Sequence, residues 1–152
     1  MKVVDNTFAA HHIALTVRDI ETSATFYAIF GFRLALQWAA RDGSLIIAHL
    51  SRADGFILEM WQYAVNKERP IAERAVGNDL ELLGVKHIAF KVPDVRAAYA
   101  ELLAMGRGEL TKVQLGRTGV EYFFIADPDG NWVEVVQDDR RLDVDNPVSL
   151  TQ

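Results

Sequence analysis

The chain has 152 residues, of which 50% are apolar and 24% are charged, and its net charge is −5. This length suits one domain or two small halves that share a core, and the apolar share excludes a disordered chain. The lack of cysteine excludes disulfides, thiolate zinc sites and a cysteine nucleophile. The acidic balance predicts no nucleic-acid partner. No apolar run approaches the roughly 20 residues of a membrane span, so we expect a cytoplasmic protein.

The first half of the chain predicts a strand, a helix and three further strands. Apolar and β-branched runs bounded by turn residues indicate the strands. Asp19 is suited to cap the start of the helix, and Gly31 is suited to end it. Asp42-Gly43 and Asp54-Gly55 indicate hairpin turns. In chain order, the expected elements are a strand at 11–17, a helix at about 20–30, and strands near 33–40, 44–51 and 56–62.

The second half repeats the first without a gap at a shift of 75 residues. It predicts a strand at 86–92, a helix at 95–105, and strands near 109–115, 119–126 and 131–137. We therefore expect one domain that contains two modules, at about 9–62 and 85–138, with a linker at 63–84 and a polar tail at 139–152. The identities between the halves are His12-Ile13-Ala14 with His87-Ile88-Ala89, Val17 with Val92, Asp19 with Asp94, Gly31 with Gly106, Asp54-Gly55 with Asp129-Gly130, Glu59 with Glu134, and Gln62 with Gln137.

The histidines and glutamates of the repeat are expected on one face of the sheet. Strand side chains alternate between faces, and the bulky set must pack under the helix. The opposite face then carries small alanines next to the histidines and one glutamate in the last strand of each half. The expected helix-facing residues are Ile13, Leu15, Val17, Leu58 and Met60 in the first half, and Ile88, Phe90, Val92, Val133 and Val135 in the second.

These four residues predict a metal site. A glutamate among apolar neighbours is costly to bury without a compensating positive charge, and no Lys or Arg shares its face on its own strand. Two imidazoles and two carboxylates suit a divalent Ni, Zn, Co, Mn or Fe ion. The spacing of 47 residues from His12 to Glu59 recurs from His87 to Glu134. The alternative is that each histidine is an ordinary strand residue.

Other side chains near these positions are candidates for different roles. Trp61, Trp132 and Ile57 share the face of the glutamates, and with Phe124 they are candidates for contacts to a small-molecule substrate. Aromatic residues in strands are nevertheless more often part of a core. His49 aligns with Phe124 and so has no counterpart in the repeat. We interpret His49 as part of the core or of a pocket wall.

Three segments of the chain resemble the vicinal oxygen chelate (glyoxalase/bleomycin resistance/dioxygenase) superfamily. They are HHIALTVRDIETSATFYAIFGFRL, KHIAFKVPDVRAAYAEL and FFIADPDGNWVEVVQ, within a resemblance that covers about residues 9–138. The resemblance implies an α+β fold with two βαβββ modules in tandem, which form a curved-sheet cup with helices on its outer face. It also implies a divalent metal held by ligands that match His12, Glu59, His87 and Glu134, within one chain or across a homodimer.

The resemblance further implies a proton transfer of the isomerase, epimerase or lyase type. A substrate would chelate the metal through vicinal oxygens, and Glu134 or Glu59 would act as the general base. Glyoxalase I typically has an Arg and an Asn, both glutathione contacts, where this chain has Thr16 and Tyr63, so we expect no glutathione dependence. Two alternatives remain open: an Fe(II) extradiol ring-cleaving dioxygenase, and a drug-binding protein of the bleomycin-resistance type.

Overall fold

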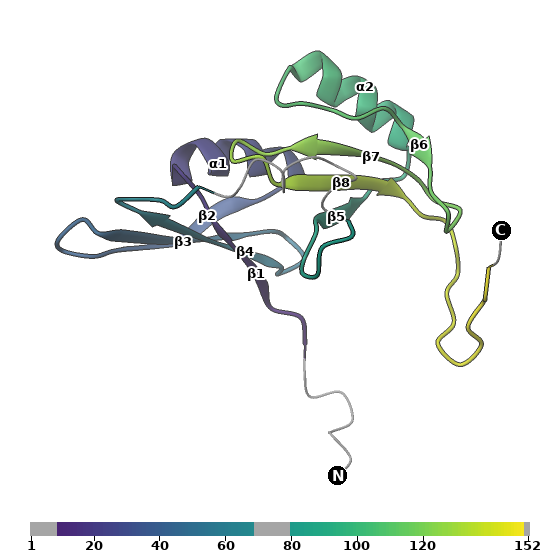
Figure 1. Cartoon of the computed structure of the whole chain (residues 1–152), viewed down its shortest axis with the longest axis horizontal. Coiled ribbons are helices and arrows are strands. Elements are labelled where there is room, and N and C mark those ends of the chain that lie inside the picture. Colours follow the sequence, from purple (N-terminus) through teal and green to yellow (C-terminus); the bar gives the residue numbers. More distant parts are fainter. Residues whose placement is uncertain (1–8, 69–79, 151–152) are drawn as a thin grey trace, which may run out of the picture. The chain divides into compact units, whose positions relative to one another are not determined.

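The computed structural model of the chain describes residues 9–68 and 80–150. The chain divides into two units, residues 1–69 and 70–152, and each unit contains its own four-stranded sheet and one α-helix (Figure 1). The predicted strand–helix–strand–strand–strand order is confirmed in both units. The predicted linker at 63–84 lies partly outside the described residues, and its first residue, Tyr63, belongs to a strand.

The first unit has a mixed sheet in the order β1-β4-β3-β2. Strand β1 runs parallel to β4, and the other neighbouring strands are antiparallel. A single 3-10 turn, η1, follows the helix and ends at Gly31, whose φ of 86° explains why glycine is needed there. The elements are β1 (His12–Thr16), α1 (Ile20–Tyr27), η1 (Ala28–Phe30), β2 (Arg33–Ala39), β3 (Leu45–Ser51) and β4 (Ile57–Tyr63).

The second unit repeats this topology in the order β5-β8-β7-β6, with β5 parallel to β8. Its helix ends at Gly106, which has a φ of 60°. The elements are β5 (Ile88–Lys91), α2 (Val95–Met105), β6 (Gln114–Leu115), β7 (Glu121–Ala126) and β8 (Trp132–Gln137).

Two of the strands predicted in the second half differ most from the structure, in which they are shorter. Strand β5 begins at Ile88, so His87 directly precedes it. The strand expected at 109–115 is reduced to β6, because the hydroxyl of Thr111 accepts the hydrogen bond of the Phe124 N–H at 2.9 Å. A side chain there replaces the backbone acceptor that a regular strand would offer.

Each helix begins at a capping aspartate that the repeat contains twice. The side chain of Asp19 accepts a hydrogen bond from the Thr22 N–H, and that of Asp94 accepts from two N–H groups in the first turn of α2. Gln62 and Gln137 accept from the first N–H of α1 and of α2, at 2.7 and 3.1 Å. The repeated aspartate thus caps the start of each helix. The repeated glutamine joins that start to a strand of the same unit, β4 or β8.

We expect Asp94→Ala to lower the free energy of unfolding by about 1 kcal/mol, as is typical for the loss of an N-cap acceptor. Asp94→Asn keeps an oxygen that can accept the same hydrogen bonds and should retain most of the stability. Urea unfolding followed by circular dichroism measures both values. Equal losses for the two variants would contradict a capping role for Asp94.

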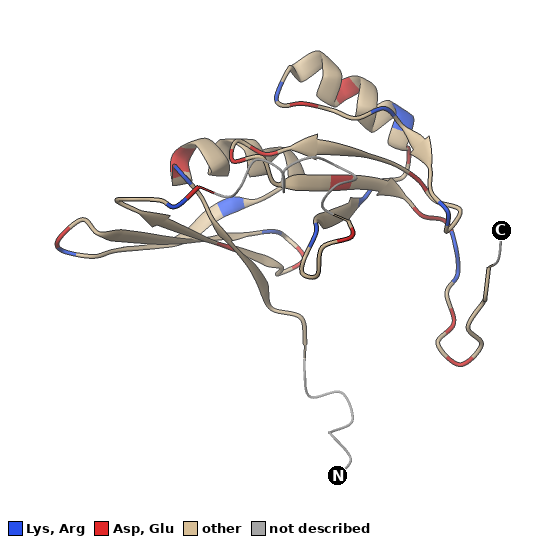
Figure 2. Cartoon of the chain, in the orientation of Figure 1, with Lys and Arg blue, Asp and Glu red and all other residues tan. Residues whose placement is uncertain are grey.

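The predicted alternation of faces is confirmed by burial. In β4, Leu58 and Met60 are fully buried, and Val133 and Val135 have the same place in β8. Charged residues lie mainly on turns, loops and helices, whereas the strands are mostly uncharged (Figure 2). Glu59 and Glu134 are therefore carboxylates within otherwise uncharged strands. Across 9–68 and 80–150, no helix has the length and hydropathy that crossing a bilayer requires.

Candidate functional site

Glu59 lies in the middle of β4, between β1 and β3. Its backbone is in register with Ala14 on one side and with His49 on the other. The helix packs on the side of Leu58 and Met60, so the carboxylate of Glu59 belongs to the opposite face. Its side chain is 18% exposed, and its Oε2 lies 3.9 Å from Nε2 of His12. The first unit thus brings together one predicted histidine–glutamate pair.

Glu134 occupies the matching place in β8. It is in register with Ala89 and with Phe124, and its side chain is 16% exposed. His87, just before β5, places its Nε2 3.0 Å from Oε2 of Glu134. The second unit therefore brings together the other predicted pair, on the face away from its own helix.

The two glutamates differ in their further contacts. Nε2 of His49 lies 2.9 Å from Oε1 of Glu59, and the indole N–H of Trp61 donates to Oε2 at 2.7 Å. The pKa of Glu59 is below its usual value, chiefly because of the Trp61 hydrogen bond, with smaller contributions from His49 and His12, while burial opposes the shift. The expectation that only a cation could compensate this charge was therefore too strict for Glu59.

His49 is the residue of this site that sequence reasoning missed. Its side chain is 32% exposed and contacts the carboxylate of Glu59, so His49 is not part of the core. Its alternative place in a pocket wall stays a prediction. A signal was available: a hairpin about Asp54-Gly55 places position 49 directly opposite position 59. Reasoning from the repeat passed over it, because the second half has Phe124 at the equivalent position.

The predicted substrate contacts lie around the two pairs. Phe124 is buried and packs edge-on against the ring of His87, with 5.1 Å between the ring centroids. It also packs edge-on against Trp132, with 6.2 Å between the ring centroids. The ring of Trp61 stacks on Tyr63 at 6.4 Å. Ile57 is half-buried at the start of β4. Their roles toward a substrate stay predictions.

No group of three His, Asp or Glu side chains that could hold a metal ion occurs in the part of the chain that the structure describes. The first unit places the imidazoles of His12 and His49 beside the carboxylate of Glu59. The second unit places the imidazole of His87 beside Glu134. Each unit's pair is therefore short of a complete metal centre.

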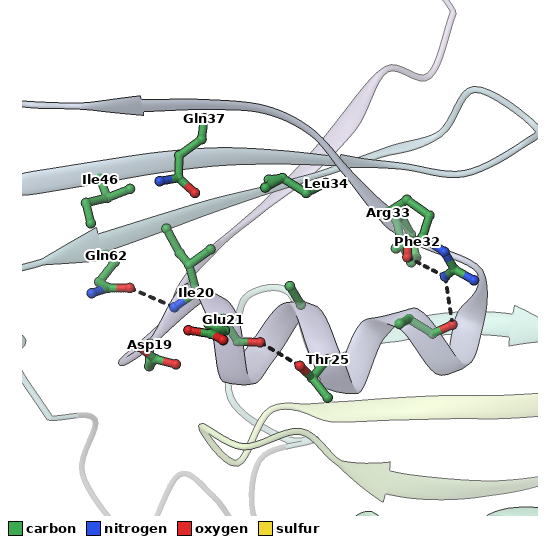
Figure 3. Close-up of a pocket in the computed structure, with 12 residues that line it drawn as sticks. Asp19, Ile20, Glu21, Thr25, Phe32, Arg33, Leu34, Gln37, Ile46 and Gln62 are labelled. Atoms are coloured by element: carbon green, nitrogen blue, oxygen red, sulfur yellow. Dashed lines mark hydrogen bonds between the residues drawn. The ribbon is translucent and has the colours of Figure 1, made fainter.

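A pocket of about 560 Å³ lies elsewhere in the first unit, between α1 and the strands β2, β3 and β4 (Figure 3). Gln62 and Ile46 line it, and they are a registered pair on the helix-facing side of the sheet. Glu59 and Gln62 are three positions apart in β4, so their side chains lie on opposite faces of the sheet. The pocket is therefore separate from the histidine–glutamate pair.

Comparison with known proteins gives a family match over most of the chain. The model described as Glyoxalase/Bleomycin resistance protein/Dioxygenase superfamily matches residues 9–135. A glyoxalase family protein from Enterococcus faecalis has a crystal structure that matches with a TM-score of 0.68 and 25% identity, over 83% of this chain and 94% of that chain. The glyoxalase-like fold expected from the sequence is thereby confirmed.

Two curated relatives also match most of the chain. The chain is 26% identical over 147 residues to a lactoylglutathione lyase of Schizosaccharomyces pombe, covering 86% of this chain and 48% of that protein. It is 31% identical over 134 residues to the uncharacterized protein YwbC of Bacillus subtilis, covering 83% of this chain and 94% of that protein. The chain thus spans about half the length of the S. pombe enzyme.

Proposed function

Because the chain belongs to the glyoxalase/bleomycin resistance protein/dioxygenase superfamily, we propose that it is a metal-dependent enzyme that transfers a proton on a small substrate. The substrate would bind a divalent metal ion through vicinal oxygens. Isomerisation, epimerisation and lyase reactions of this type all begin with removal of a proton from a substrate carbon. We also propose that the protein acts in the cytoplasm as a homodimer.

One observation carries this proposal: a histidine and a glutamate are paired at equivalent positions of both repeats. The Nε2–Oε2 distances are 3.9 Å for His12 and Glu59 and 3.0 Å for His87 and Glu134. Both carboxylates lie in the strand that comes last in the sequence of their unit, β4 or β8, on the face away from the helix. Imidazole and carboxylate are both ligand types that divalent metals of this class prefer, and their recurrence on the same face supports a metal site.

The donor set fits a divalent metal of borderline character. Two neutral imidazoles and two carboxylates bring a net charge of about −2 to a divalent cation, and nitrogen and oxygen ligands suit Ni, Zn, Co, Mn or Fe. Among the described residues, no three His, Asp or Glu side chains are arranged so that they could hold a metal ion. We therefore propose that His12 and Glu59 of one module act with His87 and Glu134 of another.

In this mechanism the protein supplies the base and the surroundings, while the bound metal would withdraw charge from the substrate oxygens and so acidify the neighbouring carbon. Glu134 accepts the proton from that carbon on its carboxylate and then donates it to a carbon of the deprotonated substrate, which gives the product. Its side chain is 16% exposed, which limits competition from water. Trp61, Trp132, Ile57 and Phe124 would hold the apolar part of the substrate.

We propose that the substrate is not a glutathione adduct. Thr16, at the end of β1, and Tyr63, at the end of β4, cannot provide the guanidinium and the amide expected of a glutathione site. The relative from S. pombe is named a lactoylglutathione lyase, so this point needs a direct assay. Glutathione adducts of methylglyoxal should be turned over no better than adducts of other thiols.

Metal analysis of the purified protein is the first test. We expect about one divalent ion for each pair of modules, lost on treatment with a chelator and restored by Ni²⁺ or Co²⁺. Folded protein that takes up no divalent ion at all would contradict the proposal.

Substrate assays then separate the reaction classes. Thiol adducts of methylglyoxal, CoA thioesters and catechols are each incubated with the Ni²⁺, Co²⁺, Mn²⁺ and Fe(II) forms, in D₂O to detect proton exchange at carbon. Exchange supports the proposed proton transfer. Activity that requires Fe(II) and O₂ would indicate the extradiol dioxygenase instead, and drug binding that a chelator does not change would indicate a resistance protein.

A further inference from the structure

The two glutamates have the same backbone surroundings but different neighbours across the hairpin. Each has an alanine at its side on the parallel strand, Ala14 or Ala89. On the antiparallel strand, Glu59 is opposite His49, whereas Glu134 is opposite Phe124. Both modules therefore contain the histidine–glutamate pair, but only the first has a histidine opposite its glutamate on the antiparallel strand.

Glu59 is held at both of its oxygens. Nε2 of His49 contacts Oε1 at 2.9 Å, and the Trp61 indole donates to Oε2 at 2.7 Å. An ionised carboxylate only accepts hydrogen bonds, so Nε2 of His49 carries the hydrogen in this contact. Each carboxylate oxygen can accept two bonds, which leaves both oxygens of Glu59 able to bind a metal as well.

Glu134 has different surroundings across the hairpin. Nε2 of His87 lies 3.0 Å from its Oε2. Phe124 presents a ring without a donor, and that ring packs edge-on against His87. The contact of His49 with Glu59 therefore has no equivalent at Glu134, because Phe124 occupies the matching position.

We infer that His49 is a positioning residue that holds Glu59 as a stationary metal ligand. This inference rests on the proposed function and adds a role for a residue that has no counterpart in the second module. Metal-ligating carboxylates are commonly held by hydrogen bonds from outside the ligand set, and loss of such a partner typically weakens metal binding about 10- to 100-fold. His49 and Trp61 supply this support in the first module.

The test is His49→Phe, which gives the first module the residue found at the equivalent place in the second. Ni²⁺ affinity is measured by calorimetry, and the coordination of Co²⁺ is followed by its visible absorption spectrum. We expect about 10- to 100-fold weaker Ni²⁺ binding and a changed Co²⁺ spectrum. His49→Gln keeps an N–H donor and should bind Ni²⁺ within a few-fold of the unmodified protein.

Trp61→Phe provides a second variant, because it removes the other donor to Glu59 and leaves His49 in place. It should weaken Ni²⁺ binding in the same direction as His49→Phe. His49 is partly exposed, so His49→Phe should remain folded, and thermal unfolding verifies this.

The outcomes separate this inference from the proposed function. If the unmodified protein binds Ni²⁺ and His49→Phe binds it equally well with the same Co²⁺ spectrum, the positioning role is wrong and the proposed function stands. Equal losses for His49→Phe and His49→Gln also overturn the role of the donor. If the unmodified protein binds no divalent ion, the proposed function fails and the role of His49 fails with it.

Discussion

Replacing Glu134 by glutamine is expected to reduce turnover by about a thousandfold, within the range of the contribution of a general base. Glutamine has nearly the same shape as glutamate and can still offer an oxygen to a metal, but it cannot take a proton at neutral pH. The effect should therefore fall on kcat. Metal content, measured by plasma spectrometry, should change much less.

Two further variants identify which glutamate is the base. Glu59→Gln should act mainly by weakening metal binding, because the carboxylate of Glu59 is held by His49 and Trp61. Glu101→Gln, on the exposed surface of α2, is the control for the loss of one negative charge and should leave kcat unchanged. A Glu134→Gln variant with normal proton exchange at the substrate carbon would show that Glu134 is not the base.

Replacing His87 by alanine is expected to weaken divalent metal binding by more than about 100-fold, since loss of a direct ligand should exceed the 10- to 100-fold effect of losing an outer partner. Protons compete with a metal ion for its ligands, so the affinity of the unmodified protein for Ni²⁺ should also fall at acidic pH. Titration calorimetry with Ni²⁺ measures both effects. His12→Ala should give a loss of similar size, although it lies in the other module.

His11→Ala separates loss of a ligand from loss of its neighbour. His11 precedes β1, and its Nδ1 contacts Nδ1 of His12 at 2.8 Å, but His11 is not one of the repeated histidines. His11→Ala should therefore weaken Ni²⁺ binding less than His12→Ala does, because it removes an outer contact and keeps the ligand. A His87→Ala variant that binds Ni²⁺ normally would remove the second module from the proposed metal site.

Mixing the two alanine variants shows whether the site forms within one chain or between two. If each site combines modules of different subunits, a mixed dimer of His12→Ala and His87→Ala contains one site with all four ligands. Metal binding and turnover then return after the variants are unfolded and refolded together. If both modules of a site come from the same chain, the mixture stays as inactive as each variant alone.

Most of the fold could be predicted because its signals are local or repeated. Asp19 and Asp94 cap the helices as expected, and Gly31 and Gly106 end them with positive φ. The exceptions have physical reasons. Strand β6 is short because the hydroxyl of Thr111 accepts the hydrogen bond of the Phe124 N–H. The alternation of apolar and polar residues in the sequence does not predict such a side-chain hydrogen bond.

The sequence by itself determined the two modules, the faces of their strands and the two recurring histidine–glutamate pairs. Periodicity and capping act over a few residues, and the duplication makes the remaining pattern visible. Only the tertiary structure decided what surrounds each glutamate. The contacts of Glu59 with His49 and Trp61 depend on the register of the hairpin and on the direction of the side chains. Both are set only when the strands pair and the carboxylate of Glu59 becomes partly desolvated.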